Sequence, residues 1–360
     1  MNRRSFLRSA TATSLAAAFA PRIALAAEER WRTFETVTRV EIKDAFGTAR
    51  AWVPLPLAVD TDWQRTLDNS WSGNARLARV ERDDKYGITM LHAEWSEQEM
   101  NPAIEVTSRF MTRERAVDLA KSSPELDLTA QERAFYTAPT DLIPTDGIVL
   151  KTAQEVTRGA RSEVEKSRAI YEWVVDHTFR DPKTRGCGVG DVKSLLESGN
   201  LGGKCADLNA LYVGLSRAVG VPARDVYGIR VAPSKYGYKS LGAGSANITK
   251  AQHCRAEFFA RGHGWVPVDP ADVRKVVLEE PPGNLPVKDH KVLAARQRLF
   301  GGWEMNWLAY NMGHDVKLPN SKGPKLPFLM YVNAEADGEM RDPLEPDSVR
   351  YTITAREITA

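Results

Sequence analysis

Three residues in the second half of the chain have the side chains and the order that thiol chemistry requires. Cys205 follows a Gly-Gly pair, His253 lies 48 residues further on, and Asp269 lies 16 residues after the histidine. A thiol nucleophile needs a base that takes its proton, and the base needs a carboxylate that fixes its imidazole. The trio therefore predicts attack on an acyl group, with cysteine as nucleophile, histidine as base and aspartate as the orienting group.

The segment after Cys205 predicts a helix that would activate this thiol. Apolar residues recur on one helical face, at Leu208, Leu211, Tyr212, Leu215 and Val219. Gly220 and Pro222 end the helix. At a helix N-terminus, unpaired N–H groups and the macrodipole favour a thiolate over a thiol. We also expect the glycines before Cys205 to admit a substrate carbonyl and to supply oxyanion donors.

The histidine and the aspartate fall in two candidate strands, HCRAEFFA and GWVPVDP, which the turn RGHG joins. A symmetric turn would place Asp269 opposite Ala256. That position is three residues from His253, or about 10 Å along a strand. Asp272 would face His253 instead, so strand geometry alone leaves Asp272 as an alternative orienting carboxylate.

Three blocks of the chain resemble the transglutaminase-like superfamily: GGKCADLNALYVGLSRAVGVPAR, HCRAEFF and GHGWVPVDP. The similar region runs roughly from Lys151 to Val273. The resemblance implies a papain-like α+β core, in which a helix bundle packs on an antiparallel sheet. It also implies a catalytic trio of Cys205, His253 and Asp269, which favours Asp269 over Asp272.

The chain departs from the family pattern at two places. Cys254 and Arg255 follow the histidine, where the family usually has small and aromatic residues. Asn200 and Leu201 stand where an aromatic residue often precedes the Gly-x-Cys turn. Both departures bear on substrate preference and oxyanion geometry, and neither alters the trio.

Changes of pattern along the chain predict its domains. Alternation with period two from Trp31 to about Leu119 indicates an antiparallel β domain, similar through its WVPLP stretch to one often attached to bacterial family members. Ser162 and Glu165 form a capping box before a helical run. We expect a signal peptide at 1–26, a β-sandwich-like domain at 27–120, a connector at 121–150, the catalytic core at 151–280 and, at 281–360, an extension that packs on the core or the β domain.

The first 26 residues predict export. Arg3 and Arg4, followed by Phe6 and Leu7, form a twin-arginine pattern, and cleavage is expected after Ala26. The apolar run is too short to span a bilayer, which takes about 20 residues. We therefore expect a periplasmic protein without membrane insertion after signal removal.

Composition narrows the possible partners. The net charge is +2, with acids and bases interspersed, and there is no basic run of the kind that binds nucleic acid. No CxxC motif or histidine pair has metal-ligand spacing. We expect no cofactor and no metal, and a protein, peptide or amide substrate. The sequence does not indicate an oligomeric state.

Several functions remain open. Water as acyl acceptor gives a peptidase or amidase, whereas a primary amine gives a cross-linking transglutaminase. The absence of a calcium-type acidic loop favours hydrolysis. A non-catalytic binding or envelope module would have no need for all three members of the trio, and a redox function lacks the CxxC motif.

The other two cysteines, Cys187 and Cys254, have two interpretations. Cys254 follows His253 on a strand, so its side chain should point to the opposite face, away from the catalytic cleft. Cys187 lies in the glycine-rich loop RGCGVGD and could reach it to form a disulfide, which would leave Cys205 as the free thiol. Alternatively, both are buried small hydrophobes.

Overall fold

The structure is a computed structural model that describes residues 30–45 and 47–358. The expected signal peptide at 1–26 lies outside these residues. Residues 31–360 form one compact unit. Within the described ranges, no helix combines the length and the apolar character needed to cross a bilayer.

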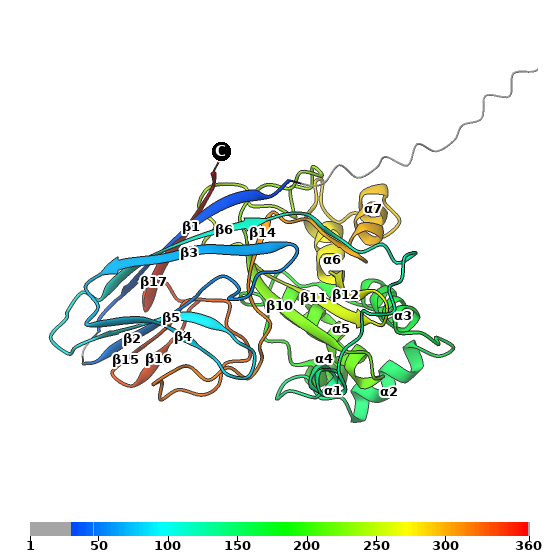
Figure 1. The fold of residues 1–360 in the computed structure, drawn as a ribbon, viewed down its shortest axis with the longest axis horizontal. Coiled ribbons are helices and arrows are strands. Elements are labelled where there is room, and N and C mark those ends of the chain that lie inside the picture. Colours follow the sequence, from blue (N-terminus) through cyan, green and yellow to red (C-terminus); the bar gives the residue numbers. More distant parts are fainter. Residues whose placement is uncertain (1–29, 46, 359–360) are drawn as a thin grey trace, which may run out of the picture. The chain divides into compact units, whose positions relative to one another are not determined.

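Two sheets form a β-sandwich at the N-terminal side of the sequence (Figure 1). One sheet has the strand order β17 (Val349–Ile358), β1 (Arg32–Ile42), β6 (Ala103–Thr112), β3 (Gln64–Gly73). The other has the order β16 (Glu339–Arg341), β15 (Asn333–Ala336), β2 (Ala49–Pro54), β5 (Thr89–Trp95), β4 (Leu77–Arg82). Alternate side chains from both sheets, such as Val40, Val106, Ala51 and Leu91, form a common apolar core.

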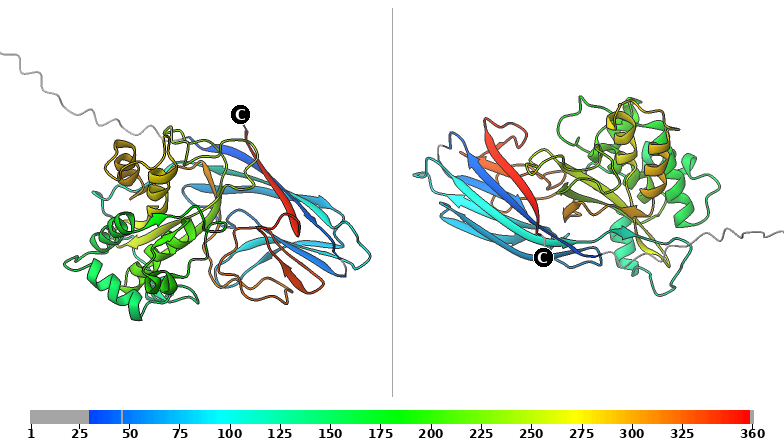
Figure 2. Two further views of the ribbon diagram at one scale, coloured as in Figure 1. Left: turned by 180° about the vertical axis from the view of Figure 1, so that it is seen from behind. Right: turned by 90° about the horizontal axis from the view of Figure 1, so that it is seen from above.

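The end of the chain completes this sandwich. Strand β17 pairs antiparallel with β1, and Val40 lies opposite Tyr351. In both views of Figure 2 the red C-terminal strand lies beside the blue first strand. The alternating run near the C-terminus, expected as a strand, is therefore an edge strand of the first sheet.

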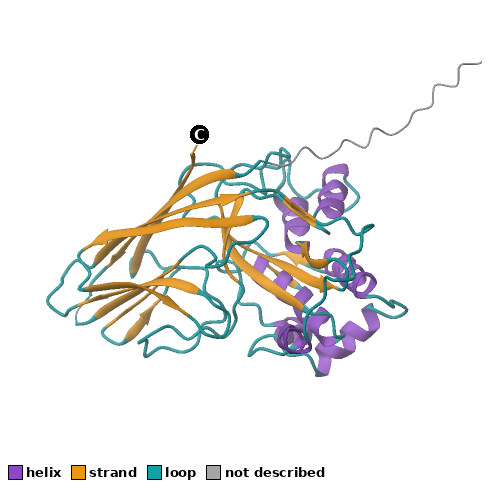
Figure 3. Ribbon diagram, viewed as in Figure 1, coloured by secondary structure: helices purple, strands orange, loops and turns teal. Residues whose placement is uncertain are grey.

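A further antiparallel sheet, separate from the two sandwich sheets, carries the helices. Its strand order is β12 (Gly264–Val268), β11 (Gln252–Ala260), β10 (Ala223–Arg230), β14 (Trp307–Asn311). The described helices are α1 (Ala130–Thr137), α2 (Gly147–Val156), α3 (Glu163–His177), α4 (Val192–Ser198), α5 (Cys205–Ala218), α6 (Pro270–Glu279) and α7 (His290–Arg298). Figure 3 shows these helices gathered around this helix-bearing sheet. The fold is thus α+β, as expected.

Two short strand pairs tie loops to this core. One joins β7 (Arg115–Ala116) to β13 (Gly302–Trp303), and the other joins β8 (Phe179–Arg180) in parallel to β9 (Gly202–Gly203). The second pair lies directly before Cys205 in the sequence. It therefore anchors the turn from which helix α5 starts.

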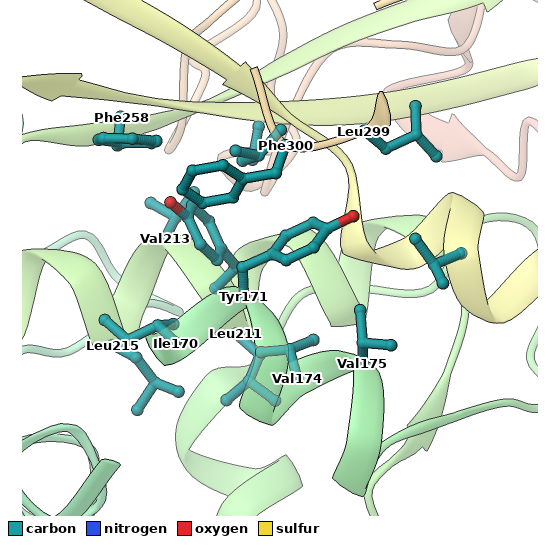
Figure 4. Packing of buried hydrophobic residues seen from close by; sticks show 14 of the residues in the cluster. Ile170, Tyr171, Val174, Val175, Leu211, Val213, Leu215, Phe258, Leu299 and Phe300 are labelled. Atoms are coloured by element: carbon teal, nitrogen blue, oxygen red, sulfur yellow. The ribbon is translucent and has the colours of Figure 1, made fainter. Parts of the chain in front are cut away.

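Apolar side chains from helices and sheet close the helical core (Figure 4). The ring centroids of Tyr171, on α3, and Phe300 lie 5.2 Å apart, and the Phe258 ring of β11 lies 5.6 Å from Phe300 in a tilted arrangement. The Tyr171 hydroxyl donates to the Arg296 carbonyl at 2.9 Å. The capping box expected at Ser162 and Glu165 is present and fixes the start of α3.

The structure adds detail to the segments on either side of the core. Residues 121–150 contain α1, which begins with a capping box between Thr129 and Glu132, and the first residues of α2. After residue 280, β14 joins the helix-bearing sheet, whereas β15, β16 and β17 join the sandwich. The last part of the chain thus contributes to both.

Candidate active site

Helix α5 begins at Cys205, with Lys204 as its N-cap residue. The helix is almost entirely buried, because it packs against β11 and β10 on one side and against α2 and α3 on others. Cys205 is 4% exposed. As the first helical residue, it lies where the N–H groups have no intrahelical acceptor and the macrodipole stabilises an anion.

Asp207 holds this helix start and the preceding loop together. Its carboxylate accepts hydrogen bonds from the backbone N–H groups of Lys204, Val189 and Gly190, each at 3.0 Å. Burial raises the pKa of Asp207 despite these bonds. Asp207 thus acts as a clamp that fixes the 187–190 loop against α5.

Glycine at position 188 is required for this clamp, and we predict that Gly188→Ala is strongly destabilising. Gly188 has φ +90°, and a Cβ there would overlap the Asp207 carboxylate. Gly159 has the same φ of +90°, but no described heavy atom lies within 4 Å of a Cβ at that position. Gly159→Ala should cost only the left-handed backbone strain, about 1 kcal/mol. Gly188→Ala should cost about 2 kcal/mol more in the free energy of unfolding.

Denaturant unfolding of both variants measures the difference, and slower alkylation of Cys205 in Gly188→Ala would report the displaced loop. Equal destabilisation by the two substitutions would contradict the clamp.

The expected glycine roles at 202 and 203 need correction. A Cβ at Gly202 would overlap the Phe179 ring, and a Cβ at Gly203 would overlap Asp207. The Gly202 N–H donates to the side chain of Asn200 at 3.2 Å. Both glycines are needed because neighbouring groups occupy the space of a side chain.

The structure brings His253 and Asp269 into contact. His253 Nε2 lies 2.7 Å from Asp269 Oδ2 and 3.4 Å from Asp272 Oδ1. All three side chains are buried. With Nε2 engaged by the carboxylates, Nδ1 is the ring nitrogen left to exchange a proton with the thiol.

The expected strand register was wrong by one residue. Val268, not Asp269, pairs with Ala256, and β12 ends at Val268. Asp269 is the N-cap of α6 and accepts the Asp272 N–H at 3.0 Å, so Asp272 lies in the first helical turn rather than on a strand. The turn from strand to helix brings both carboxylates back towards His253, with Asp269 closer.

Two polar side chains hold this pair of carboxylates. Asn209, one turn after Cys205 on α5, donates to the Cys254 carbonyl at 2.8 Å and to Asp269 Oδ1 at 3.3 Å. Arg230 donates to Asp272 Oδ1 at 2.6 Å. Burial opposes ionisation of Asp272, but Arg230 and His253 outweigh it and hold its pKa well below the usual range. Burial and the neighbouring Asp272 raise the pKa of Asp269.

The expectation that Cys254 lies away from the catalytic cleft was also wrong, although it does lie on the face of β11 opposite His253. Cys187, Cys205 and Cys254 belong to one buried cluster, and all three are free thiols, without a disulfide between Cys187 and Cys254. Cys254 faces the helix side together with Ala256 and Phe258, and α5 lies on that side. Cys205 therefore lies against the face of β11 that carries Cys254. His253, near the start of β11, interacts with the Cys205 sulfur from there.

These neighbours invert the usual proton affinities of thiol and imidazole. Cys187 first, then Cys254 and His253, stabilise the Cys205 thiolate by hydrogen bonding and lower its pKa well below the usual value despite burial. For Cys187, hydrogen bonding to Cys205 and burial raise the pKa. Burial and Arg230 oppose protonation of His253, but Asp272 and Asp269 outweigh them and raise its pKa to about 9. Both shifts favour a thiolate beside an imidazolium over a neutral thiol beside a neutral imidazole.

His253, Asp269 and Asp272 are also the described residues whose donor atoms could hold a metal ion, since these atoms lie within 4.8 Å of one another. Arg230 already binds Asp272, and two N–H groups already bind Asp269 Oδ1. A guanidinium inside the cluster repels a cation. The donor set therefore fits a hydrogen-bonded trio better than a metal centre.

Sequence reasoning missed Tyr331 and Gln252 near the thiol, and it noted Arg255 without its contacts. The Cys187 N–H donates to the Tyr331 hydroxyl at 2.8 Å. The Gln252 side-chain nitrogen is buried without a hydrogen-bond partner among the described residues, and both Gln252 and Tyr331 line the cavity that reaches Cys205. Arg255 lies over the Trp307 ring, and burial lowers its pKa to about 10. Only the position of Gln252 beside His253 could have suggested one of them.

This arrangement defines an α+β protein with a cysteine at a helix start, a histidine on the adjoining sheet and an aspartate that caps the next helix. The profile of the transglutaminase-like superfamily matches residues 150–270. An uncharacterized protein of Haemophilus influenzae is 34% identical over 338 residues, which is 90% of each chain. The chain belongs to the transglutaminase-like superfamily.

Solved structures match the chain at low sequence identity. A proposed cysteine protease from Cytophaga hutchinsonii matches over 92% of both chains, with 13% identity and a TM-score of 0.57. The periplasmic domain of TgpA from Pseudomonas aeruginosa matches 73% of this chain and 92% of its own, with 14% identity and a TM-score of 0.34.

Proposed function

We propose that this protein is a thiol-dependent acyl-transfer enzyme that hydrolyses peptide or amide bonds. In this proposal Cys205 is the nucleophile, His253 the acid and base, and Asp269 the orienting carboxylate. The observation that carries it is geometric: Cys205 is the first residue of helix α5, and His253 Nε2 lies 2.7 Å from Asp269 Oδ2. The directions of the pKa shifts at Cys205 and His253 agree with this geometry, because they favour a nucleophile and an acid that are ready before the substrate arrives.

The first half of the reaction forms a thioester. The Cys205 sulfur attacks the acyl carbon, and the carbonyl electrons move to the oxygen, whose negative charge the N-terminal end of the α5 dipole stabilises. As the tetrahedral intermediate collapses, the C–N bond breaks and the His253 imidazolium gives its proton to the leaving amine. Asp269 keeps the ring in the orientation that this transfer needs.

The second half consumes water. Neutral His253 takes a proton from a water molecule, whose oxygen attacks the thioester carbon. Collapse of this intermediate breaks the C–S bond, releases the carboxylic acid and restores the thiolate beside the imidazolium. A primary amine in place of water would give the cross-linking reaction.

The proposal also covers the cellular location of the protein and the division of the chain into domains. We propose export by the twin-arginine route and action in the periplasm, supported by the pattern at residues 1–26. The proposed division keeps 151–280 as the catalytic core, and the C-terminal extension supplies part of the lining of the cavity that reaches Cys205. This part includes Leu344, Arg350 and Tyr351.

The pH dependence of alkylation at Cys205 tests the proposal. Iodoacetamide labelling at Cys205, followed by peptide mapping, should reach half its maximal rate well below the roughly 8.5 of a free thiol. Cys187 and Cys254 are internal controls in the same digests, since both should stay protonated and react slowly. A titration of Cys205 near the free-thiol value would argue for a structural cysteine and a non-catalytic module.

A further inference from the structure

We infer that the cleft at Cys205 selects an anionic acyl donor, namely a peptide segment that carries carboxylate side chains. The inference rests on the proposed function, because it names the substrate class of that site. A cavity of about 640 Å³ reaches Cys205, and Gln252 and Tyr331 are among its other lining residues. This volume is in the range of sites that bury a ligand the size of a short peptide.

The walls of this cavity carry charge of one sign. Seven basic side chains line it, and none of the described residues that line it is acidic. The seven are Arg180, Arg185, Lys204, Arg230, Lys250, Lys275 and Arg350. The sequence as a whole has 49 basic and 47 acidic residues, so this concentration of positive charge arises only when the chain folds.

Acidic residues outside the lining neutralise only part of this charge. Four of the basic side chains pair with three acids: Arg180 and Lys275 with Glu279, Arg185 with Asp342, and Arg230 with Asp272. Lys204, Lys250 and Arg350 form no ion pair with any residue that the structure describes. A concave site lined by one sign of charge focuses its field and attracts the opposite charge.

The three cations without ion pairs line the same cavity as the nucleophile. Lys204 directly precedes Cys205, Lys250 lies three residues before His253, and Arg350 comes from strand β17 of the sandwich. An acyl donor that presents its amide to Cys205 therefore meets cations from separate elements. The amide is the bond broken in the proposed reaction, which favours an acidic peptide over a nucleic acid or a lipid surface.

A pair of small alkylating agents tests the charge preference without any turnover. Iodoacetate carries the carboxylate that iodoacetamide lacks, and both report on the same sulfur. At an ionic strength of about 0.01 M, where the Debye length is about 30 Å, Cys205 should favour iodoacetate. Raising the ionic strength to about 1 M should lower the iodoacetate-to-iodoacetamide rate ratio roughly fivefold.

Substitutions test whether the basic residues of the cavity cause the preference for iodoacetate. The double variant Lys250→Gln, Arg350→Gln should lower the same rate ratio roughly threefold to tenfold at low salt. Lys151→Gln is the matched control, since it removes one exposed cation from α2 outside the cavity and should leave the ratio unchanged. If neither salt nor the double variant changes the iodoacetate-to-iodoacetamide rate ratio, the inference is wrong.

Peptides extend the test to the substrate. In pairs that differ only by Glu→Gln beside the scissile amide, the acidic member should have the higher kcat/KM, and the double variant should shrink the difference. Equal kcat/KM within each pair, or protection of Cys205 from alkylation by an oligonucleotide or an anionic vesicle but not by the acidic peptide, would overturn the inference. If no peptide is cleaved while iodoacetate preference persists, the proposed function fails and the anion site stands.

Discussion

Replacing Cys205 by alanine is expected to lower kcat/KM for amide hydrolysis by at least ~10⁴-fold. The sulfur forms the covalent bond to the acyl carbon, so its loss removes the pathway rather than one stabilising contact. The fold should persist, because the substitution removes one buried sulfur atom and the free energy of unfolding should change by only about 1 kcal/mol. Turnover of a chromogenic amide and denaturant unfolding measure the two quantities.

Cys254→Ala is the matched control for this substitution. It also removes one thiol from the buried cluster, but the proposed function gives this sulfur no covalent bond to substrate. Its S–H group only helps to stabilise the Cys205 thiolate, so the rate should fall less than ~10-fold and the pKa of Cys205 should rise. Wild-type turnover in Cys205→Ala, or complete loss in Cys254→Ala alone, would refute the assignment of the nucleophile.

Local patterns predicted the elements of the site well. The apolar stripe after Cys205 gave helix α5, and the capping box at Ser162 gave α3, because both features depend on neighbours within a few residues. The β-sandwich was predictable from alternation for the same reason. The order of Cys205, His253 and Asp269 then indicated the family.

The sequence could not show which residues far apart in the chain lie close together in the fold. Asp269 was expected on a strand, but the proline at position 270 starts a helix and Asp269 caps it, so the carboxylate is aimed by a strand-to-helix corner. The proximity of Cys187 to Cys205 depends on the Asp207 clamp. The basic cavity needs β17, which returns from the end of the chain. No local pattern encodes any of these.

The second large effect is expected from Asp269→Asn, which should lower kcat/KM by roughly 10²-fold or more. The amide cannot stabilise the imidazolium as the carboxylate does, and it can hold the wrong tautomer by donating to Nε2. Helix α6 should remain capped, since asparagine caps helices about as well as aspartate. Asp191→Asn is the matched control: Asp191 caps α4 in the same way, by accepting the Ser194 N–H at 2.9 Å, and should leave kcat/KM unchanged.

Asp272→Asn separates the two carboxylates, because it should act on stability and on pH rather than on orientation. It leaves the buried Arg230 without its partner at 2.6 Å, which should cost about 3–5 kcal/mol of unfolding free energy. It also removes a negative charge that favours the imidazolium, so the pKa of His253 should fall from about 9. Activity that needs the thiolate–imidazolium pair is lost as pH rises through this pKa, so the alkaline limb of the kcat/KM profile should move to lower pH. A larger loss of kcat/KM at the pH optimum in Asp272→Asn than in Asp269→Asn would make Asp272 the orienting carboxylate.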